Sequence, residues 1–196
     1  MAEQKKYKKR GSTSSLLLLL LLLVALVVAI VVWPVDAKAS TTMQEPNDLE
    51  STTLINAGDT APDFTVEMLD GRSVTLSELK GNVVMVCFWA TWCPPCREEM
   101  SHMQEGVIDA FAGEDFVVLP ISRGEKRETV EAFLAKMGYT FPVGLDGDQS
   151  IYKKYATNYI PRTFIVGKDG VVVYRAIGYD EDIAKEVHEA VANALK

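Results

Sequence analysis

The chain has few of the residues that build disulfide frameworks or metal sites, with three cysteines and two histidines among its 196 residues. Disulfide frameworks of small secreted proteins use an even set of four or more cysteines, so here one pair and one odd thiol remain. A structural zinc site usually needs a second pair of Cys or His ligands, and Cys87, His102 and His188 show no such spacing. We therefore expect neither a cysteine framework nor a bound metal.

Basic clusters are missing beyond the amino terminus. Residues 1–35 hold five basic residues and one acidic residue, so of the total net charge of −7 the remaining chain carries −11. Nucleic-acid binding draws its affinity from clustered Lys and Arg side chains. The composition therefore argues against a nucleic-acid partner, and the acidity indicates solubility rather than a particular substrate.

The amino-terminal segment has no charged residue from position 11 to position 35, and its apolar run at residues 16–32 follows a basic head. About 17 to 25 apolar residues can span a bilayer, whereas a cleavable signal normally has about 7 to 15. We expect residues 1–35 to be a single-pass signal-anchor that leaves the amino terminus inside and the rest on the extracytoplasmic face of the membrane. Cleavage after Ala39, which would release a periplasmic protein, is the alternative.

Residues 36–57 are polar and mixed, with one proline and no aromatic residue. This composition predicts a flexible linker. The remaining residues, 58–196, have the length of one ordinary domain.

From residue 58 onward, strand-like and helix-like segments alternate. Residues 83–89 form a continuous apolar run, as expected of a central strand that is buried on both faces. The expected strands are residues 64–68, 73–75, 83–89, 116–121, 141–145, 163–166 and 171–177, and the expected helices run from 94 to about 112 and over 126–137, 149–155 and 180–195. This order predicts an α/β fold with a mixed sheet, helices on both faces and an amino-terminal β-hairpin.

Cys93 and Cys96 stand where the central strand leads into a helix. Pro94 and Pro95 suit a first helical turn, where the missing N–H of proline would be unpaired anyway. The positive end of the helix dipole favours the thiolate of Cys93, which we expect to be the attacking sulfur. Cys96 should resolve the mixed disulfide that Cys93 forms. Such a redox-active disulfide needs no other cofactor; a static disulfide is the alternative, although so short a loop gives little stabilisation.

Residues 88–100, F-W-A-T-W-C-P-P-C-R-E-E-M, resemble the active-site segment of the TlpA/ResA-like branch of the thioredoxin superfamily. Further similar segments are A-P-D-F at 61–64, F-P-V at 141–143 and I-P-R-T-F-I-V at 160–166. The resemblance covers residues 58–196 and implies a thioredoxin-like fold. It also implies an anchored or periplasmic thiol-disulfide oxidoreductase, of a kind that often serves cytochrome c maturation.

The resemblance implies roles for two residues outside the cysteine pair. Glu99 matches a buried acidic residue that tunes the pair; such a carboxylate could relay the proton of Cys96, and its desolvation would raise its pKa. Pro161 matches a cis-proline packed opposite the cysteines, which would leave the backbone of Ile160 to pair with a client strand. The alternatives are a surface position for Glu99 and an ordinary strand-edge proline.

The sequence also predicts roles for other residues in and around the motif. We expect Trp92 to cover the disulfide, with core packing as the alternative, and Trp89 to lie in the core. Cys87, inside the apolar strand, is expected to be structural, because free cysteine there behaves as a small hydrophobe. The Pro94-Pro95 dipeptide departs from the Gly-Pro of general thioredoxins and agrees with this branch; together with Trp92 we assign it to the client-binding surface.

The leading hypothesis is a reductase of client-protein disulfides, supplied by a membrane or extracytoplasmic electron donor, with apocytochrome c as a candidate client. An oxidase with the same residues is the nearest alternative. A peroxiredoxin-like peroxidase would share the A-P-D-F start but uses one activated cysteine. A non-catalytic module that binds haem, an apocytochrome or a metal is the third alternative.

Overall fold

The computed structural model describes residues 22–24 and 46–196. The predicted domain lies within one compact unit, Gln44–Lys196. Of the predicted anchor at residues 16–32, residues 22–24 are described and are helical, and the rest of that prediction lies outside the described residues. No helix within the described ranges combines the length and the apolar character that crossing a membrane requires.

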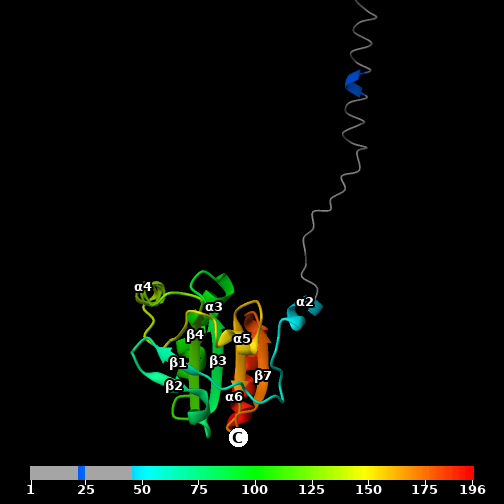
Figure 1. The fold of residues 1–196 in the computed structure, drawn as a ribbon. Coiled ribbons are helices and arrows are strands. Elements are labelled where there is room, and N and C mark those ends of the chain that lie inside the picture. Colours follow the sequence, from blue (N-terminus) through cyan, green and yellow to red (C-terminus); the bar gives the residue numbers. More distant parts are fainter. Residues whose placement is uncertain (1–21, 25–45) are drawn as a thin grey trace, which may run out of the picture. The chain divides into compact units, whose positions relative to one another are not determined.

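The elements follow one another in the predicted order, with two additions near the amino-terminal end (Figure 1). The strands are β1 (Thr65–Met68), β2 (Ser73–Thr75), β3 (Val83–Trp89), β4 (Phe116–Arg123), β5 (Gly144–Asp146), β6 (Arg162–Val166) and β7 (Val172–Ile177). The helices are α2 (Pro46–Ser51), α3 (Pro94–Met103), α4 (Arg127–Met137), α5 (Tyr152–Tyr155) and α6 (Glu181–Leu195), with a 3-10 helix η1 (Leu76–Leu79) and a π-helical turn η2 (Gln104–Ile108). The additions are α2 and η1.

The strands form one seven-stranded mixed sheet in the order β2-β1-β5-β4-β3-β6-β7. β3 pairs in parallel with β4 and antiparallel with β6, and β4 pairs in parallel with β5. The predicted hairpin is present as β1 and β2, and it joins the sheet where β1 pairs with β5. Its turn uses Gly71 at φ 85°, a left-handed conformation that glycine adopts at no steric cost. The mixed α/β fold is therefore confirmed.

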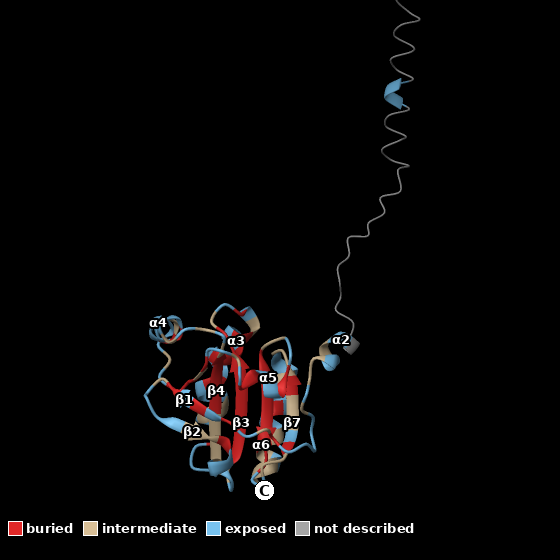
Figure 2. Ribbon diagram, in the orientation of Figure 1, coloured by how far each residue is buried: buried red, intermediate tan, exposed pale blue. Residues whose placement is uncertain are grey.

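Every residue of β3 is buried, because side chains alternate between two covered faces of the sheet (Figure 2). Val84, Val86 and Phe88 lie in one hydrophobic cluster, which also contains residues of η1 and α5. The alternate residues of the strand, Cys87 and Trp89 among them, lie in a second cluster with residues of α3, α4 and α6. Helices thus cover both faces, as predicted.

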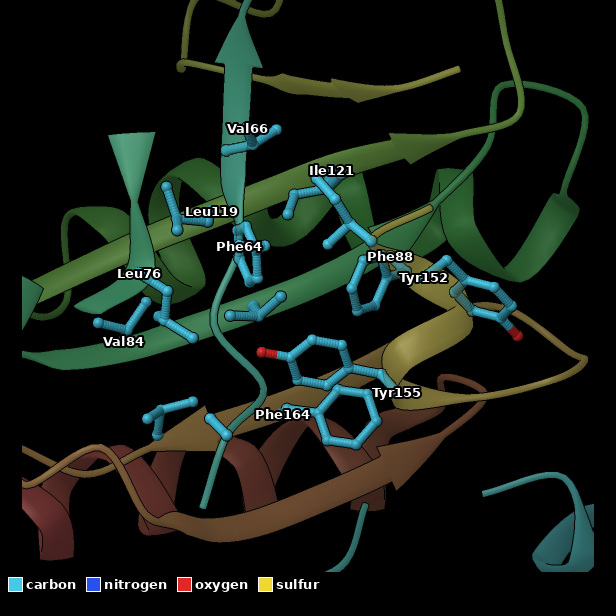
Figure 3. Close-up of a cluster of buried hydrophobic side chains, with 14 of the residues drawn as sticks. Phe64, Val66, Leu76, Val84, Phe88, Leu119, Ile121, Tyr152, Tyr155 and Phe164 are labelled. Atoms are coloured by element: carbon cyan, nitrogen blue, oxygen red, sulfur yellow. The ribbon is translucent and has the colours of Figure 1, made fainter. Parts of the chain in front are cut away.

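The first cluster is built around aromatic rings (Figure 3). Phe88 lies 5.4 Å from Tyr152 and Tyr155 between ring centroids, and Tyr155 lies 5.1 Å from Phe164. The Tyr155 hydroxyl donates to the carbonyl oxygen of Pro62 at 2.7 Å, so its polar group is satisfied inside the core. The rings thus pack α5 against β3 and β6.

Three predicted boundaries are wrong, one by about nine residues and two by three residues. The helix expected to reach about residue 112 is α-helical only to Met103, and η2 follows with Gly106 at its centre, a residue that disfavours helix interiors. The strand expected from residue 141 begins at Gly144, after Pro142, which has no N–H to donate to a sheet. The helix expected from residue 149 begins at Tyr152, because Gln149 has φ 62°.

The predicted flexible linker, residues 36–57, is corrected over its second half. Residues 46–51 form α2, and Thr53 makes a β-bridge with Ala156. The N–H of Leu54 donates to the carbonyl of Tyr155 at 3.0 Å. Polar composition alone suggested a tether, but residues 46–57 find hydrogen-bond partners on the folded domain. The first half of the prediction lies outside the described residues.

Candidate active site

The cysteine pair stands at the junction of β3 and α3, where the strand ends beside the first turn of the helix (Figure 1). Cys93 is the N-cap residue, Pro94 and Pro95 occupy the first turn, and Cys93 and Cys96 form a disulfide. The N–H of Cys96 donates to Cys93 Sγ at 3.3 Å. An amide of the first turn therefore already points at the sulfur where negative charge develops on reduction, which stabilises a Cys93 thiolate.

The start of β6 faces the pair from the neighbouring strand. Phe88 at the end of β3 is in register with Arg162 at the start of β6, and this pairing places the preceding loop beside the cysteines. Cys93 Sγ lies 3.6 Å from the carbonyl oxygen of Ile160. The Ile160–Pro161 peptide bond is cis, as the resemblance implied, and Pro161 is buried.

Glu99 is buried on the same helix as the cysteines, with 5% of its surface exposed. Its Oε2 accepts a hydrogen bond from Cys87 Sγ at 3.2 Å, and its Oε1 accepts one from Thr163 Oγ1 at 2.9 Å. Burial raises the pKa of Glu99 to about 7, against the opposing effect of the two hydrogen bonds. The surface alternative for Glu99 is wrong, and the carboxyl can exchange a proton near neutral pH.

Two partners of Glu99 were not assigned to the site from the sequence. Cys87 is buried in β3 as expected, but its thiol also donates to the carboxylate, and burial raises its own pKa well above the ordinary value. Thr163 reaches Glu99 from β6, since it lies in register with Cys87 across the β3–β6 pairing. The sequence alone does not identify Thr163 as a site residue, because its contact with Glu99 depends on how β6 pairs with β3.

A cavity of about 190 Å³ leads to the buried carboxyl. Its lining includes Glu99, Met85, His102, Tyr179 and His188. Both histidines of the chain therefore border this space, although neither shows metal-site spacing in the sequence. Across the part of the chain that the structure describes, no group of three or more His, Cys, Asp or Glu side chains is arranged to hold a metal ion.

The loop before Cys93 is held by a carboxylate that the sequence did not reveal. Glu125 Oε2 accepts hydrogen bonds from the Thr91 N–H at 2.9 Å and from Ser122 Oγ at 2.9 Å. Its Oε1 accepts from Thr91 Oγ1 at 2.5 Å. The parallel register of β3 and β4, which pairs Trp89 with Ser122, brings these residues together. Glu125 thus fixes the backbone two residues before Cys93.

The tryptophans on either side of this loop differ in exposure. Trp89 is fully buried, so the core prediction is confirmed. Trp92 exposes 65% of its surface, which rules out core packing for it. Its predicted role as a cover of the disulfide stays a prediction.

A helix-capping disulfide on a mixed sheet, with a cis-proline opposite and a buried acid behind it, defines a thioredoxin-like thiol-disulfide oxidoreductase. Residues 57–175 match the model of the AhpC/TSA family. The thiol-disulfide oxidoreductase ResA of Geobacillus thermodenitrificans is 35% identical over 120 residues, which cover 61% of this chain and 68% of that protein. The chain therefore belongs to the AhpC/TSA family and, within the thioredoxin superfamily, to its TlpA/ResA-like branch.

Solved structures agree with this assignment. A Bacteroides thetaiotaomicron protein, proposed to be a protein disulfide isomerase, superposes with a TM-score of 0.69 at 35% identity, covering 74% of this chain and 92% of that one. A Chlorobium tepidum protein, proposed to be a thiol:disulfide interchange protein DsbE, gives 0.67 at 27% identity, covering 72% and 99%. The enzyme class predicted from the sequence is thus confirmed.

Replacing Thr163 with valine should shift the titration of Glu99 upward. The valine keeps the shape of threonine but removes the hydroxyl that stabilises the carboxylate at 2.9 Å, and a lost hydrogen bond to a charged group corresponds to about one pKa unit. We expect the Glu99 pKa to rise from about 7 to roughly 8, as followed by carboxyl-selective NMR. Thr163→Ser retains the donor and should keep the wild-type value; an unchanged pKa in Thr163→Val would contradict the role given to this hydrogen bond.

Proposed function

We propose that this protein reduces disulfides of client proteins outside the cytoplasm, cycling the Cys93–Cys96 pair between dithiol and disulfide. The observation that carries the proposal is the placement of Cys93 Sγ, which receives the Cys96 N–H at 3.3 Å and lies 3.6 Å from the Ile160 carbonyl. The first contact stabilises a thiolate, and the second places client-accessible backbone beside the reacting sulfur. Two cysteines bonded to each other favour dithiol exchange over the one-cysteine chemistry of a peroxidase.

The reaction then proceeds in two exchange steps. The Cys93 thiolate attacks one sulfur of a client disulfide, so that a Cys93–client bond forms while the client S–S bond breaks and its other sulfur leaves as a thiolate. Cys96 next gives its proton to the Glu99 carboxylate and attacks Cys93 Sγ. This step forms the Cys93–Cys96 disulfide and releases the second client thiolate. The client gains two electrons and the pair loses two, which an extracytoplasmic or membrane electron donor must restore.

The groups around the cysteines have distinct proposed roles. Glu99 accepts and returns the proton of Cys96, since its pKa of about 7 lets it act in both directions. Ile160 and Pro161 present the backbone to an extended client segment. Trp92 and the Pro94-Pro95 turn flank that segment, with Trp92 exposed enough to contact it.

The cellular setting of the proposal comes from the amino-terminal segment and from the relatives. The basic head and the apolar run at residues 16–32 support export, with the run as an anchor or a signal. Disulfide exchange with client proteins fits the oxidising compartments outside the cytoplasm. The similarity to a thiol-disulfide oxidoreductase and to a proposed thiol:disulfide interchange protein supports disulfide exchange with clients. Apocytochrome c is the candidate client that the resemblance to the TlpA/ResA-like branch implies.

The direction of electron flow is tested by the redox equilibrium of the cysteine pair. Thiol-disulfide proteins range over about 150 mV, from reducing thioredoxin to oxidising DsbA, which separates reductase from oxidase clearly. We expect a potential at the reducing end, about −250 mV, measured by equilibrating the full chain with defined glutathione or dithiothreitol ratios and trapping free thiols. A potential as oxidising as that of DsbA would assign the oxidase function instead.

A further inference from the structure

Residues 46–57, here called the strap, run directly beside the loop that carries Ile160 and Pro161. Thr53 forms an antiparallel bridge with Ala156, and the Thr157 N–H donates to the carbonyl of Thr52 at 2.9 Å. The strap therefore pairs with the chain just before the loop at residues 158–161, here called the cis-proline loop. The same loop lies opposite Cys93.

Arg162 joins the strap to the cis-proline loop through hydrogen bonds. The residue directly follows Pro161 and is fully buried. Its Nε and Nη2 donate to the carbonyl oxygen of Asn158 at 3.2 and 3.0 Å, closing the loop across its base. Its Nη1 donates to Thr53 Oγ1, and Nη2 also donates to Thr52 Oγ1. One guanidinium thus holds both ends of the loop and two hydroxyls of the strap.

The buried charge of Arg162 makes these hydroxyls important. None of the ion pairs formed among the described residues includes Arg162, and burial lowers its pKa. Glu50 acts on Arg162 only through a weaker electrostatic attraction. A buried cation with no carboxylate in ion-pair contact depends on neutral oxygen acceptors, and a donor left unpaired there is strongly destabilising. Thr52 and Thr53 supply two of those acceptors.

The strap also has anchoring contacts that do not involve Arg162. Arg175 on β7 forms an ion pair with Glu50 of α2, and its Nε donates to Asn56 Oδ1 at 3.0 Å. The Tyr159 hydroxyl, within the cis-proline loop, donates to Asp48 Oδ2 at 3.3 Å. The strap is therefore anchored at both of its ends and contacts the loop in between.

We propose that the strap positions the cis-proline loop for client binding, with Thr52 and Thr53 acting as positioning residues through Arg162. The inference rests on the proposed function, because it concerns how the same site accepts an extended client. The hydroxyls hold the guanidinium, the guanidinium holds the carbonyl of Asn158, and that carbonyl sets the path of the chain to Ile160. Loss of the hydroxyls should impair reaction with clients that pair with the loop and leave the cysteine chemistry itself unchanged.

The test compares two disulfide probes on the reduced protein. One is a synthetic peptide that contains an oxidised C-x-x-C pair and can pair with the loop; the other is 5,5′-dithiobis(2-nitrobenzoate), which has no backbone. For Thr52→Val/Thr53→Val we expect the rate constant with the peptide to fall about tenfold, equivalent to about 1.4 kcal/mol. The rate with the small probe and the equilibrium with glutathione should stay at the wild-type values.

Matched variants separate positioning from general stability. Thr52→Ser/Thr53→Ser keeps the hydroxyls and should restore the peptide rate. Thr65→Val/Thr75→Val removes another pair of bonded threonine hydroxyls, 3.0 Å apart on the β1–β2 hairpin, and should leave both rates unchanged. If the double valine variant does not fold, each single valine variant is measured instead. Each should lower the peptide rate about threefold, which corresponds to about 0.7 kcal/mol.

The outcomes distinguish this inference from the proposed function. A wild-type protein that reacts with neither probe through Cys93 would overturn the proposed function. A wild-type protein that reacts with both, together with a double valine variant of equal peptide rate, would overturn the strap inference alone. A valine variant that loses both rates equally would also overturn it, because the strap would then support the cysteines or the fold rather than the loop.

Discussion

A Cys96→Ser variant accumulates its clients as mixed disulfides on Cys93, whereas the wild-type protein releases them. The serine cannot attack the Cys93–client bond, so the second exchange step stops and the covalent intermediate persists. We expect the trapped fraction to rise by more than about a hundredfold, since this step loses its intramolecular nucleophile. Non-reducing gel electrophoresis of the full chain, followed by mass spectrometry of the reducible bands, measures the trapped fraction and names the clients.

The other two cysteines supply the controls for this trap. Cys93→Ser removes the attacking sulfur, so we expect no mixed disulfides and a loss of disulfide reduction of more than about a thousandfold. Cys87→Ala removes a buried thiol that donates to Glu99 and should leave the trap of Cys96→Ser intact. Mixed disulfides that survive Cys93→Ser would assign the attack to another cysteine, whereas biological activity that survives it would replace catalysis with a binding role.

The order of elements and the cysteine junction could be predicted from the sequence because their signals are local. The apolar run of β3 gives the central strand, and its bounds at Val83–Trp89 agree with the prediction. The step from that strand through Cys93 to Pro94 and Pro95 gives the start of α3. Each signal depends on residues that are neighbours in the chain, where periodicity and capping act directly.

The supporting residues of the site could not be predicted in the same way. Thr163 and Glu125 reach the site only through the registers of β6 and β4 against β3. Composition predicts a tether for the strap, whereas in the structure its polar side chains bond to Arg162 and Arg175, more than a hundred residues later in the chain. Long-range hydrogen bonds produce no periodic pattern in the sequence. Composition alone therefore predicts that the strap is exposed to solvent.

The buried carboxyl of Glu99 should cost the folded protein stability at neutral pH. Its pKa is about 7 in the folded state and 4.5 without the protein environment. Between these two pH values the folded state holds more protons than the unfolded state, so this group lowers the free energy of unfolding as the pH rises. The loss is complete above pH 7 and amounts to about 3 kcal/mol at 1.36 kcal/mol per pKa unit.

Glu99→Gln therefore separates stability from activity. We expect the variant to be more stable than wild type at pH 8, to differ less at pH 5, and yet to resolve mixed disulfides about a hundredfold more slowly at neutral pH. In wild type, the ionised fraction of Glu99 rises through pH about 7, so resolution should speed up across that range; in the variant this pH-dependent limb should disappear. Denaturant unfolding and stopped-flow resolution of a Cys93–peptide mixed disulfide, each as a function of pH, measure the two effects.

The neighbouring residue provides the matched control for this substitution. Glu98 lies on the exposed side of α3, so Glu98→Gln makes the same chemical change without altering a buried carboxyl. It should leave both the pH-dependent limb and the resolution rate at the wild-type values. If Glu99→Gln also kept the limb near pH 7, the proton acceptor for Cys96 would have to be another group. The burial of Glu99 would then need another functional explanation, because replacing this residue would stabilise the folded protein.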